Sequence, residues 1–322
     1  MNKLNQIEAV SVEDLVPPKH RYRYYLKLFN FEKIEYRLKK LEKNIGRPGY
    51  GLVCLFRCLL LQYMEDLSDR QLEEFLQTNY VGKWFCGFNL QEKVPDYSLF
   101  TVIRKKIGTE KLAKLFNLMR DQFLEKGYIR EIFSFVDSSH LIAKNNLWEE
   151  RDKAIKQKYD KLNNEILPKI AKDSEARIGC KGKKKYWYGY KKHVSVDMQS
   201  GMINKVAVTA ANINDKDGFK DVCPNGGSVY ADKGYNGAEP KAFAQEKGIH
   251  LAVIKKDNMK DKDRDLDKWY SKVRAPYEGV FSKRNNRVRY KGIVKNQFSE
   301  FMFAMCHNLR KLLVLEVSGM ST

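Results

Sequence analysis

The sequence has no long apolar segment and few of the residues that build metal clusters or disulfide frameworks. Its 322 residues include 6 Cys, none in a C-x-x-C pair, and 5 His. This pattern argues against a zinc site and a disulfide scaffold, and it is typical of a reducing cytosolic compartment. The most apolar run, residues 51–64, contains Arg57 and is too short to cross a bilayer. Residues 1–16 lack the apolar segment and cleavage site of a secretory signal.

Basic residues outnumber acidic ones along the whole chain. There are 60 Lys and Arg against 40 Asp and Glu, a formal net charge of +20. Residues 1–130 hold 23 basic and 16 acidic side chains, and residues 131–322 hold 37 and 24. The excess is therefore not confined to a tail, and it favours a polyanionic partner such as nucleic acid. A basic but otherwise ordinary protein is the alternative.

Residues 1–130 have the pattern of a helical domain. Apolar residues recur at helical spacing in residues 31–43, 51–64, 95–107 and 110–125, and Ser68 with Gln71 forms a capping box before a further helix. The basic residues Arg104, Lys105 and Lys106 would lie on one of these helices. We expect an N-terminal helical domain that contacts DNA, with a simple helical scaffold as the alternative.

From residue 131 the apolar pattern changes to that of strands mixed with helices. Strands are expected at residues 132–136, 193–196, 205–210, 228–231 and 249–254, the second and third forming a hairpin around Gly201. Helices are expected at residues 239–247 and through most of the last 55 residues. A basic, partly helical insertion is expected at about residues 145–190. The order predicts an α/β domain over residues 131–322.

Three carboxylates occupy positions suited to holding divalent cations. Asp137 follows the apolar strand IFSFV and Asp232 follows SVYA, so each is expected at the C-terminal end of a strand. Glu278 is expected near the start of a helix, with Pro276 in its first turn. Carboxylate oxygens are the ligands that hard divalent cations prefer. One such Asp alone would be a common turn or helix cap.

These residues and the segments around them resemble the DDE transposases of the bacterial insertion-sequence 4/5 superfamily, in particular the insertion sequence 5-like family. The order of its three carboxylates is matched by Asp137, Asp232 and Glu278. Asp232 follows Asp137 by 95 positions, and Glu278 follows Asp232 by 46. The segments VDSSHLIAK, KKKYWYGYKKHVSVDMQSG, VTAANINDKDG and VYADKGYNG resemble its core motifs. Residues 47–76 and 95–108 resemble its helical N-terminal domain. The resemblance covers residues 47–313. Asn285 stands where the family has Lys, and Tyr270 lies four residues before Arg274 where the family has three.

The resemblance implies an RNase H-like mixed sheet flanked by helices, preceded by an all-helical domain. It implies that Asp137, Asp232 and Glu278 bind two Mg²⁺ ions, for which Mn²⁺ would substitute. Water would cut DNA at the ends of the element, and the freed 3′-OH would attack target DNA. The implied partners are the terminal inverted repeats and target DNA, with a homodimer or higher oligomer on DNA and no membrane. The implied location is the bacterial cytoplasm, at the nucleoid.

Two basic clusters are expected to bind DNA phosphates. The first interleaves Lys with aromatic residues that could stack on an unpaired base, and the second follows Glu278 directly. In the alternative reading, the aromatic residues are strand core and the Lys side chains a solvated face. The predicted DNA-binding residues are Lys183, Lys184, Lys185, Trp187, Lys191, His193, Arg274, Lys283, Arg284, Arg287 and Arg289.

The other candidate residues have simpler interpretations. Ser138 and Ser139 are expected in a turn after Asp137, and Asp197 in the hairpin turn. Asp215 and Asp217 are expected to form local hydrogen bonds or to cap a helix, in preference to binding metal. Two other functions stay open: a decayed or domesticated transposase that binds DNA sequence-specifically without catalysis, and an RNase H-like nuclease that does not transfer strands.

Overall fold

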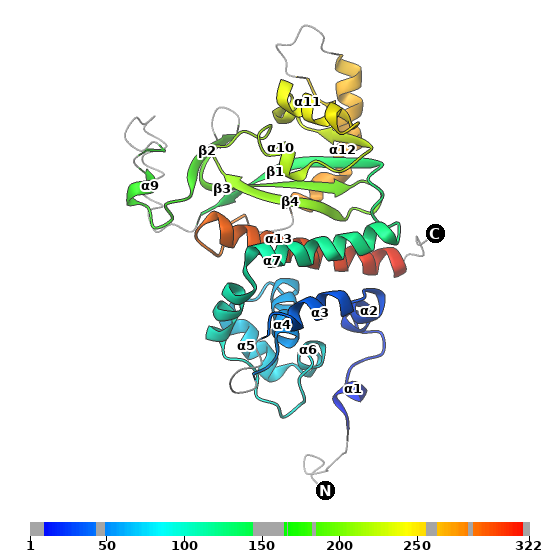
Figure 1. Ribbon diagram of the computed structural model, residues 1–322, viewed down its shortest axis with the longest axis vertical. Helices are drawn as coiled ribbons and strands as arrows, with labels where there is room; N and C mark the ends of the chain where they lie inside the picture. The colour runs from blue at the N-terminus through cyan, green and yellow to red at the C-terminus, as the bar shows by residue number, and fades with distance from the viewer. Residues whose placement is uncertain are drawn as a thin grey trace. The chain divides into compact units, whose positions relative to one another are not determined.

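The computed structural model describes residues 10–42, 49–143, 164–165, 167–181, 185–255, 263–282 and 286–317 (Figure 1). The chain divides into two compact units. One, called here the helical unit, holds residues 1–119 and 308–322, and the other, the sheet unit, holds residues 120–307. No described helix combines the length and the apolarity needed to span a bilayer.

The helical unit is built around one apolar helix. In α4, Leu59, Leu60 and Leu61 have no exposed surface, because the helix is apolar on nearly all sides and other helices surround it. The capping box of Ser68 and Gln71 starts the next helix, as predicted. The helices of this unit are α1 (Val12–Leu15), α2 (Arg21–Leu28), α3 (Glu32–Lys39), α4 (Leu52–Met64), α5 (Asp69–Thr78), α6 (Tyr80–Cys86) and the first part of α7 (Tyr97–Glu125).

The two helices predicted at residues 95–107 and 110–125 form the single element α7. Gly108 lies between them with a φ of 69° and a ψ of 163°, which is not helical, so the two halves meet at a kink. A glycine adopts this backbone conformation without the steric cost that a side chain would add. The predicted boundary is therefore a change of direction inside α7.

The sheet unit contains a six-stranded mixed sheet. β3 lies between β1 and β4 in antiparallel pairs, and β5 and β6 continue the sheet beyond β1 in parallel pairs. Three antiparallel strands followed by two parallel ones give the RNase H-like order that the sequence predicts. β2 pairs antiparallel with the first residues of β3, and β4 pairs with the residues of β3 that follow. The strands are β1 (Phe133–Ile142), β2 (Arg177–Lys181), β3 (Lys185–Asp197), β4 (Ile203–Ala210), β5 (Ser228–Ala231) and β6 (His250–Val253).

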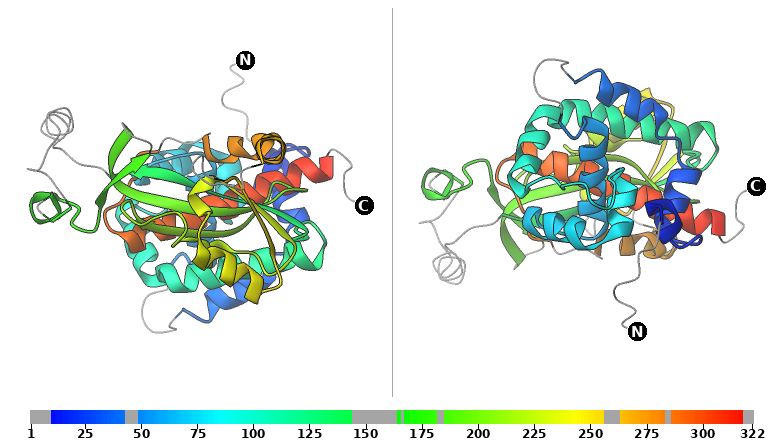
Figure 2. Two further views of the ribbon diagram at one scale, coloured as in Figure 1. Left: turned by 90° about the horizontal axis from the view of Figure 1, so that it is seen from above. Right: turned by 90° about the horizontal axis from the view of Figure 1, so that it is seen from below.

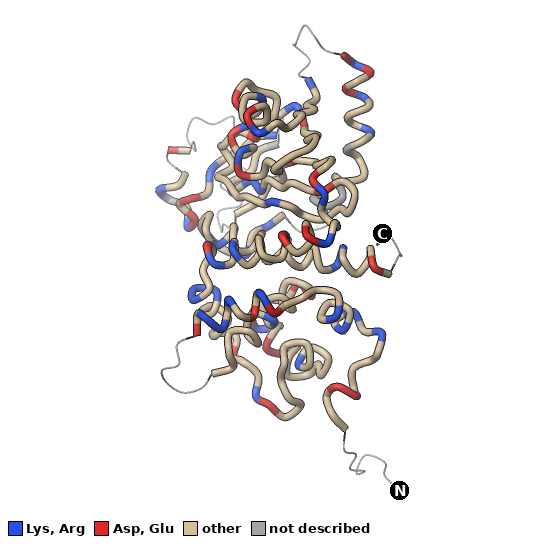
Figure 3. The backbone as a smooth tube through the Cα atoms, turned by 45° about the vertical axis from the view of Figure 1, so that its right-hand side comes forward, with Lys and Arg blue, Asp and Glu red and all other residues tan. Residues whose placement is uncertain are grey.

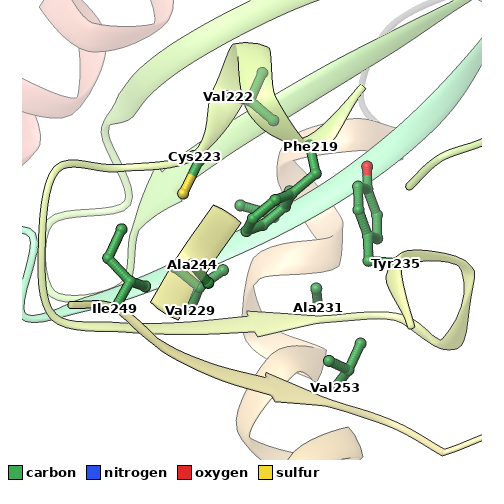
Figure 4. Packing of buried hydrophobic residues seen from close by; sticks show 10 residues of the cluster. Phe219, Val222, Cys223, Val229, Ala231, Tyr235, Ala244, Ile249 and Val253 are labelled. Carbon is green, nitrogen blue, oxygen red and sulfur yellow. The ribbon is translucent and has the colours of Figure 1, made fainter. Parts of the chain in front are cut away.

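Helices cover both faces of this sheet, as the two views of Figure 2 show. Val136 of β1 packs with Phe219 of α10 and Ala244 of α11, in the apolar cluster of Figure 4. The neighbouring Phe135 points to the other face, where its ring lies 6.4 Å from that of Tyr277 in α12. The helices of this unit are α9 (Leu167–Ile170), α10 (Phe219–Val222), the 3₁₀ turn η2 (Lys233–Tyr235), α11 (Ala238–Glu246), α12 (Arg264–Ser282) and the first part of α13 (Ile293–Val317).

Three predicted element boundaries in the sheet unit are wrong. The strand predicted at residues 193–196 is the end of β3, which begins at Lys185. β1 does not end at Val136 but continues through Ile142, because β3 pairs with it over the whole length. α12 begins at Arg264, so Pro276 and Glu278 lie well inside it and not in its first turn. Tyr270 and Tyr277, seven residues apart, pack their rings against Tyr230 and Phe135. These two ring contacts with the sheet act against the cost of an interior proline, about 3 kcal/mol.

Candidate active site

The parallel pairing of β1 with β5 brings two of the predicted carboxylates together. The last pair in this register is Val136 opposite Ala231, and Asp137 and Asp232 are the next residues on each strand. Beyond this pair β5 ends, while β1 continues along β3. The C-terminal edge of parallel strands is where ligands of α/β sheets gather. The two side chains therefore lie at the place where the sheet opens.

Both carboxylates line one cavity of about 220 Å³. The cavity also receives side chains from β2, β3 and the loop that follows β4, so it brings together residues from distant parts of the chain. Acidic, basic and aromatic side chains all contribute. The lining residues are Asp137, Ser138, His140, Cys180, Lys181, Trp187, Lys191, Asp215, Asp232, Lys233 and Gly234.

Ser138 and Ser139, expected in a turn, belong to β1. They pair with His193 and Lys192 of β3, and Asp137 pairs with Val194. At the far end of β1, the backbone amide of Ile142 donates to Asn286 at 2.7 Å, and that of Val288 donates to Ile142 at 2.9 Å. Pairing with β3 at Ser138 and Ser139, continued by the bonds at Ile142, thus overrides the local turn preference of two consecutive serines.

A buried hydrogen-bonded chain fixes the turn after Asp232. His193 contacts Tyr235 Oη through Nδ1 at 3.2 Å and Thr209 Oγ1 through Nε2 at 2.9 Å. Tyr235 also hydrogen bonds to the side chain of Ser138, the residue after Asp137. This chain joins β4, β3, η2 and β1. It holds the two strand ends that carry Asp137 and Asp232 at a fixed separation.

Burial controls the protonation of this chain. It lowers the pKa of His193 to about 4, with Lys191 acting in the same direction and Asp215 opposing. Burial, followed by the carboxylates of Asp215 and Asp137, holds the pKa of Tyr235 well above its usual value. His193 is therefore a neutral imidazole near pH 7. Since it has no exposed surface, its predicted contact with DNA would have to pass through its neighbours.

The sequence predicts that Asp215 forms local hydrogen bonds or caps a helix, but its side chain contacts a distant strand. Its Oδ1 accepts a hydrogen bond from Lys191 Nζ at 3.0 Å, and the same ammonium donates to Ile213 O at 2.8 Å. The Asp217 carboxylate remains local, because Asn214 donates to it at 3.4 Å. Sequence reasoning missed Asp215 as a pocket residue. The segment TAANINDKD resembled a family motif, but nothing in its spacing predicts an approach to β3.

The other sequence interpretations have clear structural outcomes. Asp197 is the last residue of β3, and its side chain holds the hairpin turn: its Oδ1 accepts from the backbone amides of Gln199 and Ser200, and its Oδ2 from those of Arg130 and Glu131. His140 lines the cavity and its Nε2 lies 3.0 Å from Asn286 Nδ2.

The third predicted carboxylate, Glu278, lies in α12, but its side chain is outside the described residues. Its neighbour Tyr277 packs on Phe135 and donates a hydrogen bond to the carbonyl of Met198. Phe135 and Asp137 are two residues apart and share one face of β1. Tyr277, the residue before Glu278, therefore packs on the face of the sheet that carries Asp137.

Apart from the buried His193, the predicted DNA-binding residues fall into three groups. Lys191 and Trp187 line the cavity, and the Trp187 indole is buried, with Nε1 donating to Tyr190 O at 3.1 Å. Arg287 is exposed and its backbone bridges Ile142 at the end of β1, two residues before the half-buried Arg289. The third group is outside the described residues. Nothing is described for Lys183, Lys184, Lys283 and Arg284, and only the backbone is described for Lys185 and Arg274.

The chemistry of the cavity suits a hard divalent cation. Asp137 and Asp232 supply carboxylate oxygens, the donors that Mg²⁺ and Mn²⁺ prefer. Among the described side chains, no three from His, Cys, Asp and Glu are grouped closely enough to bind a metal ion. The predicted set is completed by Glu278, whose side chain is not described. The donor types therefore fit the group that the sequence analysis expects.

Two solved structures are similar to this chain. The piggyBac transposase synaptic complex with hairpin DNA matches with a TM-score of 0.44 and 10% identity, over 92% of this chain and 76% of that one. The Mos1 transposase paired-end complex with the left transposon end matches with a TM-score of 0.18 and 9% identity, over 87% and 82% of the two chains.

Two protein families match in sequence. Residues 10–106 match the family described as "Transposase domain (DUF772)", and residues 130–309 match the "Transposase DDE domain". The second match covers more than half of the chain and includes β1, β5 and most of α13. The chain therefore belongs to the DDE transposases, a divalent-metal-dependent family whose members cleave DNA and transfer strands.

Proposed function

We propose that this protein cuts DNA at the terminal inverted repeats of its own insertion sequence and joins the freed 3′-OH ends to target DNA. Asp137, Asp232 and Glu278 are the carboxylates of the proposed site. The observation that carries the proposal is the register of β1 with β5. It sets Asp137 and Asp232 directly after the last paired residues, in one cavity with Lys191.

The three carboxylates would hold two Mg²⁺ ions, or Mn²⁺ in their place. When bound, such a pair of ions activates the attacking oxygen, neutralises charge on the phosphate and stabilises the leaving oxygen. The contribution of this chain is to hold the carboxylates in place. The hydrogen-bonded chain from Thr209 through His193 and Tyr235 to Ser138 supports this role, since it locks the turn after Asp232 against β1.

Lys191 and the segment around Arg287 and Arg289 would bind the DNA backbone. Lys191 presents an ammonium inside the cavity. Arg287 lies beside Ile142, the last residue of β1, which is five positions after Asp137. A cation next to the reacting phosphate orients it, and cations farther along the strand add affinity that depends on salt. Trp187 would support this surface from beneath, because its indole is buried against His140.

The charge distribution supports DNA as the partner. Lys and Arg occur throughout both units (Figure 3) and exceed Asp and Glu by 20 over the chain. Because two element ends must be processed together, we propose that the protein acts as a homodimer or higher oligomer on DNA, at the bacterial nucleoid. Assignment to the insertion sequence 5-like family is part of the same proposal.

A joining assay tests the proposal. A labelled DNA carrying the terminal repeat is incubated with plasmid and Mg²⁺, and the products are separated by size. Joined product supports the transposase reaction at this site. Cutting without joining would indicate a nuclease, and binding without either would indicate a decayed transposase. Glu278→Gln and Asp137→Asn should each abolish both steps, and an active variant would remove that residue from the site.

A further inference from the structure

Asp215 has contacts that neither loop structure nor the proposed carboxylate set accounts for. Its side chain is 27% exposed and accepts from Lys191 Nζ, whose side chain is 12% exposed. It also lies against the turn after Asp232, since a Cβ added at Gly234 would come within 2.7 Å of Asp215 Oδ2. Asp215 thus occupies the space between β3 and the turn that carries the second catalytic-site carboxylate.

This contact fixes the Lys191 ammonium at one side of the cavity. An ammonium has three N–H donors. Among the described residues, the loop of residues 213–215 accepts two of them, through Ile213 O at 2.8 Å and Asp215 Oδ1 at 3.0 Å. One donor is left for a ligand in the cavity. The half-buried Asp215 carboxylate also balances the charge of the lysine.

Without this contact, Lys191 would have another partner close by. The same cavity of about 220 Å³ is lined by the carboxylates of Asp137 and Asp232. A lysine has a flexible four-carbon stem and would turn toward whichever anion lies within reach. An ammonium paired with Asp137 or Asp232 would compete directly with a divalent cation for the same oxygens.

We propose that Asp215 is a positioning residue that holds Lys191 where it binds a DNA phosphate and prevents it from occupying the cation-binding carboxylates. The proposal rests on the proposed function, because it takes Asp137 and Asp232 as cation ligands. It assigns Asp215 no direct contact with the cation. Its effect passes through Lys191, so it should vanish when Lys191 is removed.

The test is a double-mutant cycle read by Mn²⁺ binding to the full-length protein without DNA, measured by titration calorimetry. Asp215→Asn should weaken Mn²⁺ binding about tenfold, because Lys191 then pairs with the cation ligands. Adding Lys191→Met should restore binding to near the wild-type level. Lys191→Met alone should leave Mn²⁺ affinity unchanged or tighter, and should lower the salt slope of DNA binding by about 0.9.

Asp217→Asn is the matched control, since Asp217 lies in the same loop and its carboxylate contacts Asn214 and not Lys191. It should leave Mn²⁺ affinity unchanged. Unchanged Mn²⁺ affinity in Asp215→Asn, or a loss that Lys191→Met fails to restore, would overturn the proposal. Thermal unfolding of each variant separates these outcomes from misfolding, and the double variant gives an independent reading if the single one is unstable. If Asp232→Asn also binds Mn²⁺ normally, the proposed function itself fails.

Discussion

Two ion pairs that pack the helical unit differ in their surroundings from one that lines the cavity of the sheet unit. In the helical unit, Arg57, the single charge in the apolar α4, pairs with Glu35, and Arg104 makes two hydrogen bonds to Asp69, one of 2.9 Å. These pairs join helix to helix. In the sheet unit, Lys191 and Asp215 pair at the wall of a cavity that also holds Asp137 and Asp232.

The difference teaches that net charge alone does not locate function. The sequence predicts Arg104 on a basic face with Lys105 and Lys106, but its side chain is 11% exposed and its guanidinium is held by Asp69. Such a pair contributes to packing of α5 against α7. The sheet unit instead gathers carboxylates and an ammonium around an open space, where they can act on a ligand.

The largest expected effect is that of Asp232→Asn in the sheet unit. The amide keeps the size and hydrogen-bonding capacity of the side chain but is a poorer ligand for a hard cation. Cleavage and joining should fall by several orders of magnitude, with affinity for the element end nearly unchanged. Gel-shift binding and Mg²⁺-dependent cleavage on the same preparation measure this. Loss of both would indicate a structural role for Asp232.

The second prediction concerns pH and His193. Its folded pKa of about 4 lies below its unfolded value of about 6.5, so the unfolded chain takes up a proton in this window and the folded chain does not. Stability should therefore fall as pH drops from 6.5 toward 4, by roughly 3 kcal/mol from this group. Urea unfolding at several pH values measures it. His193→Gln should flatten the curve, and the same change at the exposed His250 should not.

The third prediction separates stability from chemistry in the helical unit. Arg104→Ala leaves the Asp69 carboxylate without its bidentate partner, which should lower the free energy of unfolding by about 2 kcal/mol. Urea unfolding gives the value. Cleavage per folded molecule should be unchanged under conditions where the variant is folded. A defect in catalysis without a loss of stability would mean that this charge pair also serves the DNA reaction.

The smallest expected effect is a change in the salt dependence of binding. Replacing Arg287 and Arg289 with Ala should flatten the log–log slope by about 2 units if both contact phosphate. The matched pair of substitutions in the helical unit is Lys105→Ala with Lys106→Ala. Equal slopes for the wild type and the Arg variant would place the phosphate contacts elsewhere. A change in the Lys variant would assign DNA contact to the helical unit.

Much of the fold could be predicted because local patterns carried it. The capping box of Ser68, the hairpin around Gly201 and the strand SVYA before Asp232 all appear where the sequence indicates them. Each depends on residues near one another in the chain: an N-cap hydrogen bond, a turn with a φ of 69°, or a short apolar run. The catalytic roles of the three carboxylates stay a prediction, as does the domain boundary at residue 130.

The sequence by itself determined which residues could do chemistry, and the tertiary structure decided how they meet. Pairing with β3 extends β1 past two serines that favour a turn, because ladder hydrogen bonds and burial outweigh a local preference. Packing on Tyr230 and Phe135 carries α12 through Pro276. The approach of Asp215 to Lys191 and Gly234 joins three elements that are distant in sequence. No local pattern encodes that contact, since it arises only when the sheet forms and its loops fill the same space.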